Sequence, residues 1–238
     1  DVIGLIAGLE TLDREILKQS NLKVISRVGS GLSNIDIDAA GDLGISVCYT
    51  PYGPTTAVAE LVLGAMISLI RMIPLMDHDM HIKKWNKRIG FQLEGKTVVI
   101  IGYGRIGKKV AELLSSFNVN ILVVDPFCKE VIRDYTVLSV EMALPKADII
   151  TIHSSEDKCI LGDEEFSIIK SGAYLLNAAR GNLISESSLI KALDSGKVKG
   201  VWMDTFENEP YDGPLTEYEQ VVLTPHIGSY TAECRKQM

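Results

Sequence analysis

The segment 97–107 constrains the fold of this 238-residue chain more than any other part of its sequence. The run Thr97-Val98-Val99-Ile100-Ile101 has the apolar, β-branched character of a buried strand. It passes directly into Gly102-Tyr103-Gly104-Arg105-Ile106-Gly107, and a helical pattern follows over 108–117. A strand, a G-x-G-x-x-G turn and a helix in this order are typical of a unit that binds the phosphates of a dinucleotide.

The three glycines of this turn have distinct physical roles. Gly102 permits the tight turn, Gly104 lets the backbone approach a pyrophosphate, and Gly107 lets the helix pack closely on the strand. The start of the helix offers unpaired N–H groups and a partial positive charge to the phosphates. A glycine-rich turn that binds no ligand is the alternative.

A second strand, predicted at 121–124, supports the dinucleotide interpretation. It ends at Asp125, which lies 18 residues after Gly107, close to the spacing of about 20 residues that places a carboxylate on the adenosine ribose. A carboxylate there accepts hydrogen bonds from the ribose hydroxyls and repels a 2′-phosphate. We therefore expect NAD rather than NADP.

Short apolar runs alternate with helical patterns along the rest of the chain. Strands are predicted at 23–26, 45–48, 97–101, 121–124, 149–152, 174–176, 200–203 and 221–224, and helices at 11–19, 36–42, 57–71, 106–117, 163–170 and 186–195. Because the strands are almost continuously apolar, we expect parallel sheets buried on both faces. The fold class predicted is α/β with a doubly wound parallel sheet.

The run Thr50-Pro51-Tyr52-Gly53-Pro54 interrupts this alternation. Two prolines and a glycine so close together cannot continue a strand or a helix, so residues 50–56 predict a crossing between two domains. The helix predicted at 57–71 is apolar around most of its circumference, and Pro74 is expected to end it. Such a helix should be buried between layers or between subunits.

Composition narrows the classes of partner. The chain has 24 Lys and Arg against 31 Asp and Glu, a formal charge of −7, which argues against nucleic acid or an anionic membrane as the main partner. No apolar segment reaches the roughly 20 residues of a membrane span. Four widely separated cysteines predict reduced, buried thiols of a cytoplasmic protein and no metal site.

Polar residues follow three successive strands of the second half of the chain. Arg180 follows the strand at 174–176, Glu209 follows the strand at 200–203, and His226 follows the strand at 221–224. In a doubly wound sheet, ligands bind beyond the carboxyl ends of the strands. These side chains are therefore candidates for one site.

The trio suits hydride transfer to a 2-oxo acid. Arg180 would hold the carboxylate and polarise the carbonyl with its guanidinium group, which is always charged and can donate two hydrogen bonds side by side. His226 would protonate the nascent alkoxide, and a carboxylate at Glu209 would favour the protonated imidazole. The alternatives are a surface ion pair for Arg180, loop surface for Glu209 and a structural role for His226.

Other polar residues are weaker candidates for the site. His153 competes with His226 as the acid, but it follows a strand in the other half of the sheet. His78 and His81 share one possible helix face, where a solvated helix end is favoured over a metal site. The basic run Lys83–Arg88 predicts a solvated face or linker anchored by Trp85 rather than a nucleic-acid patch.

Several motifs in a fixed order make the sequence recognisable. They are Arg27-Val28-Gly29-Ser30-Gly31-Leu32-Ser33-Asn34-Ile35-Asp36, Thr50-Pro51 followed by Val58-Ala59-Glu60-Leu61, the glycine turn, Asn177-Ala178-Ala179-Arg180-Gly181, Asp204-Thr205-Phe206-Glu207-Asn208-Glu209-Pro210 and Pro225-His226-Ile227-Gly228. With them the chain resembles the D-isomer-specific 2-hydroxyacid dehydrogenases, most closely the phosphoglycerate dehydrogenase-like members, over essentially all of its length.

The resemblance implies a Rossmann cofactor domain and a smaller flavodoxin-like α/β substrate domain. We expect residues 1–52 to form the substrate domain, truncated at its N-terminal end, and residues 53–226 to form the NAD-binding domain. Residues 227–238 should begin a helix that returns to the substrate domain. Family members usually dimerise through the cofactor domain, so a homodimer is expected.

The resemblance also implies roles for individual residues. Arg180, Glu209 and His226 match the family's catalytic arginine, glutamate and histidine. Backbone N–H groups around Ser30 and Gly31 would hold the substrate carboxylate, and Arg27 would reach a distal anionic group. The residues expected to contact the cofactor are Gly102, Gly104, Arg105, Ile106, Gly107, Asp125, Ala179, Asp204 and Gly228.

The predicted function is hydride transfer between NAD(H) and a 2-oxo acid or D-2-hydroxy acid. Two alternatives stay open. One is an NAD(H)-responsive interaction protein like the transcriptional corepressors that share this fold. The other is an inactive cofactor-binding homologue, suggested by His153-Ser154-Ser155-Glu156, where the family usually has His-x-Pro-Leu.

Overall fold

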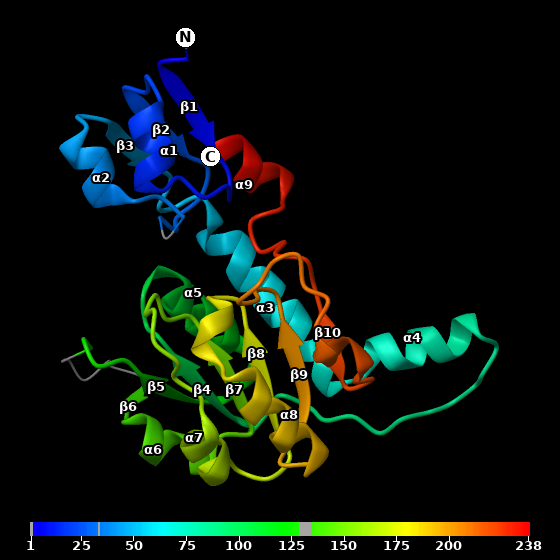
Figure 1. Ribbon diagram of the computed structural model, residues 1–238. Helices are drawn as coiled ribbons and strands as arrows, with labels where there is room; N and C mark the ends of the chain where they lie inside the picture. Colours follow the sequence, from blue (N-terminus) through cyan, green and yellow to red (C-terminus); the bar gives the residue numbers. More distant parts are fainter. Residues whose placement is uncertain (1, 33, 129–134) are drawn as a thin grey trace. The chain divides into compact units, whose positions relative to one another are not determined.

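The computed structural model describes residues 2–32, 34–128 and 135–238. The chain divides into two compact units, shown in Figure 1. Unit 1 comprises Asp1–Ala57 and Ser229–Met238, and unit 2 comprises Val58–Gly228. The sequence placed the corresponding boundaries at 52 and 226.

Unit 2 is built on a parallel sheet. Its strands are β4 (Thr97–Ile101), β5 (Asn120–Val124), β6 (Thr136–Val137), β7 (Ile149–Ile152), β8 (Ala173–Asn177), β9 (Val198–Met203) and β10 (Val221–Leu223). They lie in the order β10-β9-β8-β7-β4-β5-β6, and every pair is parallel. The order reverses between β4 and β7, so the predicted doubly wound sheet is confirmed.

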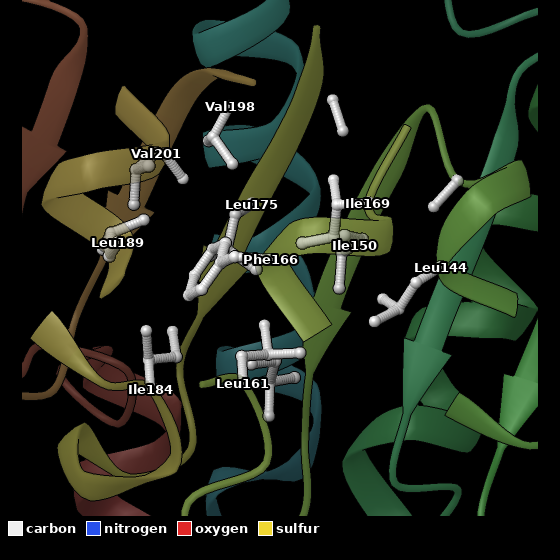
Figure 2. Close-up of a cluster of buried hydrophobic side chains, with 14 of the residues drawn as sticks. Leu144, Ile150, Leu161, Phe166, Ile169, Leu175, Ile184, Leu189, Val198 and Val201 are labelled. Carbon is white, nitrogen blue, oxygen red and sulfur yellow. The ribbon is translucent and has the colours of Figure 1, made fainter. Parts of the chain in front are cut away.

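The two faces of this sheet are covered by different helices, because successive strand residues point to opposite faces. Val98 and Ile100 pack with α3 (Pro54–Ile70) and α5 (Arg105–Leu114). Val99 and Ile101 pack in the opposite cluster with α6 (Val140–Ala143), α7 (Asp163–Ile168) and α8 (Glu186–Asp194). Figure 2 shows Leu175 in this second cluster, between Phe166 of α7 and Val201 of β9. Burial on both faces explains why the strands are almost continuously apolar.

Helix α3 is buried against the sheet, the first of the two predicted possibilities. Val62 and Met66 are fully buried in the cluster that also holds Ile100. The predicted role of Pro74 was wrong: α3 ends at Ile70, and Pro74 lies in the first turn of a further helix, α4 (Ile73–His81). Proline is tolerated in the first turn because the N–H groups there have no intrahelical partner.

Unit 1 contains a smaller parallel sheet in the order β1-β2-β3. Its elements are β1 (Gly4–Ala7), α1 (Arg14–Gln19), β2 (Val24–Arg27), α2 (Ile37–Asp42), β3 (Ser46–Tyr49) and α9 (Ala232–Gln237). Asp13 and Asp36 cap α1 and α2 by accepting backbone N–H bonds from the first turn of each helix. Ala7, Leu17 and Ile25 lie at the centre of its core. The predicted α/β character therefore holds for this unit as well.

Short 3-10 turns complete the described structure: η1 (Ser115–Phe117), η2 (Leu144–Lys146), η3 (Gly181–Leu183) and η4 (Pro214–Glu217). Over the described ranges, no single helix has the length and apolar character needed to cross a membrane. The α3–α4 pair, bent by 65°, meets that test only when its two helices are taken together.

A very close backbone approach joins two loops at the carboxyl edge of the larger sheet. A Cβ atom added at Gly181, after β8, would lie 2.0 Å from the carbonyl carbon of Phe206 and 2.1 Å from the amide nitrogen of Glu207, after β9. Any side chain at position 181 would push the two loops apart. Glycine at this position therefore fixes the spacing of the loops that carry Arg180 and Glu209.

The substitution Gly181→Ala should lower the free energy of unfolding by about 1–3 kcal/mol, the usual cost of overpacking. Urea denaturation measures this change. Gly64→Ala is the control, because nothing lies within 4 Å of a Cβ added there in α3, and it should be neutral or stabilise by up to about 1 kcal/mol. Unchanged stability of Gly181→Ala would contradict the close packing.

Candidate active site

The glycine turn between β4 and α5 has the geometry that its sequence predicts. Gly102 has a φ of +91°, and a Cβ there would lie 2.5 Å from the amide nitrogen of Ser154. A Cβ on Gly107 would lie 2.1 Å from the carbonyl oxygen of Gly102. By contrast, nothing lies within 4 Å of a Cβ added at Gly104, the residue that precedes α5. The turn is thus closely packed at Gly102 and Gly107 and open at Gly104, where α5 begins.

Asp125 holds this turn from the end of β5. Its Oδ2 atom accepts a hydrogen bond from the backbone N–H of Tyr103 at 2.7 Å, and its Oδ1 atom accepts one from the N–H of Phe127 at 2.9 Å. Each carboxylate oxygen can accept a further hydrogen bond. Arg105 and Ile106 begin α5; Arg105 is exposed, and Ile106 packs against the core.

The loop after β8 is shaped by Asn177, which is fully buried. Its side-chain amide donates to the carbonyl oxygen of Arg180 at 2.8 Å, and its Oδ1 atom accepts from the N–H of Ala179 at 3.0 Å. The Arg180 Nη1 atom donates to the carbonyl oxygen of Ala179 at 2.9 Å. Its Nε atom is buried and has no hydrogen-bond partner in the described part of the chain. Arg180 therefore keeps a donor that an anionic ligand would satisfy.

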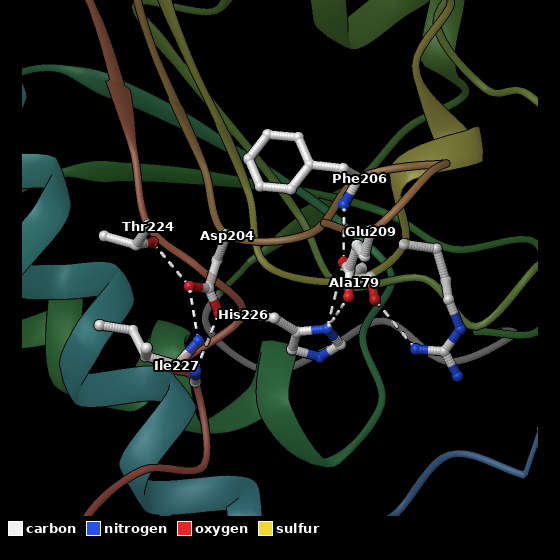
Figure 3. Close-up of polar contacts among 9 residues, drawn as sticks. Ala179, Asp204, Phe206, Glu209, Thr224, His226 and Ile227 are labelled. Carbon is white, nitrogen blue, oxygen red and sulfur yellow. Dashed lines mark hydrogen bonds and ion pairs between the residues drawn. The ribbon is translucent and has the colours of Figure 1, made fainter. Parts of the chain in front are cut away.

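Asp204 ties the end of β9 to the turn that follows β10. Its carboxylate is almost fully buried and accepts hydrogen bonds from the Thr224 hydroxyl at 2.6 Å, the Ile227 N–H at 2.9 Å and the Gly228 N–H at 2.8 Å. Burial raises the pKa of the Asp204 carboxyl, and the three donors act in the opposite direction. Figure 3 shows this cluster beside His226.

His226 and Glu209 are brought into direct contact. The backbone of His226 is left-handed, with a φ of 53°. Its Nδ1 atom lies 2.9 Å from Glu209 Oε2 and 3.2 Å from Oε1. Glu209 Oε1 also accepts the N–H of Phe206 at 3.0 Å (Figure 3). About a third of each of the two side chains is exposed, so a ligand can reach the pair.

His153, the competing histidine, lies in a different environment. Its Nε2 atom is 2.9 Å from the Thr151 hydroxyl, and its Nδ1 atom is buried without a partner among the described residues. Burial lowers the pKa of His153 to about 3. This imidazole is therefore neutral near pH 7 and cannot supply a proton as an imidazolium.

Three of the four predicted substrate-binding residues lie in unit 1, and the fourth, Arg180, lies in unit 2. Gly29, with a φ of +141°, donates its N–H to the Thr50 hydroxyl at 2.9 Å, and this contact holds the loop that contains Ser30 and Gly31. Arg27 is largely buried and donates to the Val28 carbonyl oxygen and to Asn34 Oδ1. These two hydrogen bonds tie Arg27 to its own loop.

The alternative sites gain no support from the geometry. His81 Nε2 lies 3.6 Å from Asp77 Oδ1 on α4. Within the described ranges, no group of three or more His, Cys, Asp and Glu side chains is arranged to hold a metal ion.

Several residues with a role in shaping the site were not among the predicted site residues. They are Asn177, Phe206 and Thr224, each of which bonds to a predicted residue or its loop. All three lie inside or next to the motifs that carried the resemblance. This position in or beside the motifs was one available signal, and for Asn177 and Thr224 their place directly after, or at the end of, a predicted strand was another.

Comparison with known proteins agrees with this geometry. Residues 63–228 match the family model described as D-isomer specific 2-hydroxyacid dehydrogenase, NAD binding domain. The chain is 37% identical to the D-3-phosphoglycerate dehydrogenase of Methanocaldococcus jannaschii, over 99% of this chain and 47% of that protein. It is also 37% identical to the glyoxylate reductase of Thermofilum pendens, over 96% of this chain and 72% of that protein.

Solved structures give the same result. The glyoxylate reductase from Paecilomyes thermophila superimposes with a TM-score of 0.90 at 31% identity, covering 100% of this chain and 77% of that one. The chain spans less than half the length of the D-3-phosphoglycerate dehydrogenases that it matches. Sequence and fold agree: the chain belongs to the D-isomer specific 2-hydroxyacid dehydrogenase family and carries its NAD-binding domain.

Proposed function

We propose that this protein interconverts a 2-oxo acid and a D-2-hydroxy acid with NAD(H). The contact between His226 and Glu209 carries the proposal, because it provides a proton donor beside a carboxylate at the carboxyl edge of the sheet. His153 does not provide an equivalent donor, because burial keeps it neutral. The relatives named phosphoglycerate dehydrogenase and glyoxylate reductase support this reaction class.

The cofactor fits the turn at the start of α5. The backbone at Gly104 is open to a close ligand, α5 begins without a side-chain cap, and Asp125 stands at the end of β5. We propose that Gly102, Gly104, Arg105, Ile106 and Gly107 surround the pyrophosphate and that Asp125 binds the ribose. Ala179, Asp204 and Gly228 are proposed to contact the nicotinamide half. When bound, NAD(H) supplies or accepts the hydride.

The protein's own residues divide the remaining work. Arg180 binds the substrate carboxylate and polarises the carbonyl, for which its buried, unsatisfied Nε atom is a suitable donor. His226 donates a proton from Nε2 to the developing alkoxide during reduction, while Glu209 holds Nδ1. Backbone N–H groups of Ser30 and Gly31 assist in carboxylate binding, and Arg27 serves a distal anionic group.

A screen of glyoxylate, pyruvate, hydroxypyruvate and 3-phosphohydroxypyruvate with NADH, followed by absorbance, tests the proposal. We expect turnover of at least one acid.

His226→Gln should lower kcat by roughly 100-fold or more, the usual contribution of general acid catalysis, while NADH binding measured by fluorescence changes little. Arg180→Ala should raise KM as well as lower kcat. Binding of NADH without turnover of any acid would instead favour an inactive homologue.

Glu209→Gln should lower kcat for reduction. The carboxylate of Glu209 contacts His226 Nδ1 with both oxygens, and a neutral amide forms a weaker contact that orients the imidazole less firmly. Initial rates at saturating NADH measure kcat, and NADH binding should change little. A wild-type kcat would separate Glu209 from the proton donor.

We also propose that the protein is a homodimer formed through unit 2. Helix α4 and the segment after it expose apolar side chains that unit 2 leaves uncovered: Met80 at 53%, Trp85 at 75% and Ile89 at 91%. Figure 1 shows α4 and this segment extending beyond the helices that cover the sheet. Asp79 is buried and fixes their junction, because it binds Arg88 at 3.0 Å. A second copy would cover these side chains.

Sedimentation equilibrium tests the dimer. The wild-type chain should have twice the 26.1 kDa mass of a monomer. Ile89→Lys, which places a charge on the most exposed apolar side chain of the segment, should shift the population toward the monomer. Phe127→Lys alters an equally exposed residue elsewhere in unit 2 and is the control. A monomeric wild type would rule out the proposal.

We propose that the protein is cytoplasmic, because its cysteines are free thiols. The prediction that the thiols are buried holds for Cys234 and is wrong for Cys48 and Cys159, which are exposed; all four cysteines, Cys128 included, are free. Free exposed thiols suit a reducing compartment.

A further inference from the structure

We propose that Tyr211 is a positioning residue. It holds the loop between β9 and η4, residues 204–213, and thereby sets the orientation of Glu209. The proposal rests on the function assigned to Glu209 and His226 above. Tyr211 lies two residues after Glu209, on the segment that leads from β9 to η4. It takes no part in the proposed chemistry itself.

The aromatic ring of Tyr211 supports the residue that binds Glu209. It stacks on the ring of Phe206 with the ring centroids 4.3 Å apart and the planes inclined by 19°. The backbone N–H of Phe206 donates to Glu209 Oε1 at 3.0 Å, and Glu209 in turn contacts His226. A shift of the Tyr211 ring would therefore reach His226 through three successive contacts.

The hydroxyl of Tyr211 fastens the same segment to two other elements. It donates to Glu186 Oε2, in the first turn of α8, at 2.6 Å, and it accepts the N–H of Leu215, in η4, at 3.1 Å. Burial and the carboxylates of Glu186 and Asp212 raise the pKa of Tyr211 to about 12. The phenol therefore remains a donor at every pH at which such an enzyme would be assayed.

Close packing restrains this loop on one side only. The backbone of Phe206 and Glu207 packs closely on Gly181, and the rings of Phe206 and Tyr211 stack on each other. Beside these contacts lies a cavity of about 160 Å³, lined by Glu186, Phe206, Glu207 and Tyr211 among others, which leaves room for movement. Both partners of the Tyr211–Glu186 hydrogen bond line this cavity, so the bond restrains the loop where close packing does not.

The chain contains a matched control for this bond. Tyr218 donates to Asp194 Oδ1 at 2.9 Å, so a second tyrosine–carboxylate bond joins the other end of α8 to the end of η4. Tyr218 has no described contact with Phe206 or Glu209. Loss of a phenol hydroxyl can therefore be compared at two sites on one helix, only one of which leads to the catalytic pair.

The experiment compares Tyr211→Phe with Tyr218→Phe. Both variants keep the ring and lose the hydroxyl. Tyr211→Phe should lower kcat roughly tenfold, because small displacements of catalytic groups are costly, with the KM for NADH within about twofold of wild type. Tyr218→Phe should leave kcat within about twofold. Equal kcat values for Tyr211→Phe and Tyr218→Phe would overturn the proposal.

Variants of Glu186 cover the case in which Tyr211→Phe does not fold. Glu186→Gln keeps an oxygen that accepts from the Tyr211 hydroxyl and should retain most of the turnover. Glu186→Leu removes the acceptor and should reproduce the loss of kcat. A folded Glu186→Leu protein with wild-type kcat would overturn the proposal, and thermal unfolding establishes which variants are folded.

A spectroscopic measurement separates this proposal from the proposed reaction. The Cε1–H resonance of His226 is assigned among the four histidines by its loss in His226→Gln. Its chemical shift, recorded without substrate, should change in Tyr211→Phe and stay constant in Tyr218→Phe. If the wild-type chain reduces no 2-oxo acid, the reaction assignment fails, and this comparison still decides the role of Tyr211. An unchanged His226 resonance in Tyr211→Phe would refute that role.

Discussion

The buried carboxylate of Asp204 is the interaction on which the arrangement of the site depends. A carboxylate with almost no exposure is costly unless donors surround it, and this one has three, all from the five residues that follow β10. Because the donors must converge on one point, the chain after β10 cannot run straight on. It folds into the turn that aims His226 at Glu209. The hydrogen bonds to the Asp204 carboxylate thus connect the ends of β9 and β10 beyond Met203 and Leu223, the last paired residues of the two strands.

Much of the larger unit could be predicted from the sequence, because its strands are buried on both faces and carry a strong apolar signal. The strands β4, β5 and β7 are examples. The edge strands β1 and β6 were missed. Residues of β1 such as Ile6 are 77% exposed, and β6 has only two residues. Strands this short or this exposed have no periodic pattern that distinguishes them from loop.

Helix α4 was missed for a different reason. A proline was interpreted as the end of α3, but the chain reaches the left-handed region at Met72 and starts a new helix directly afterwards. A proline can follow the end of one helix or lie in the first turn of another, and only the backbone conformation around it distinguishes the two cases. Site residues show a similar limit: the strand ends predicted Arg180, Glu209 and His226. The supports Asn177 and Thr224 depend on turn geometry that no spacing rule describes. The choice between His153 and His226 likewise depends on burial.

The left-handed backbone at His226 has a consequence for how this position is occupied. A residue with a Cβ in that conformation costs about 1–2 kcal/mol relative to the right-handed form, and glycine would relieve the cost. For folding alone, glycine is the better residue at position 226. The imidazole there is maintained at the expense of conformational stability, and the turn held by Asp204 supplies the free energy that keeps the chain in this conformation.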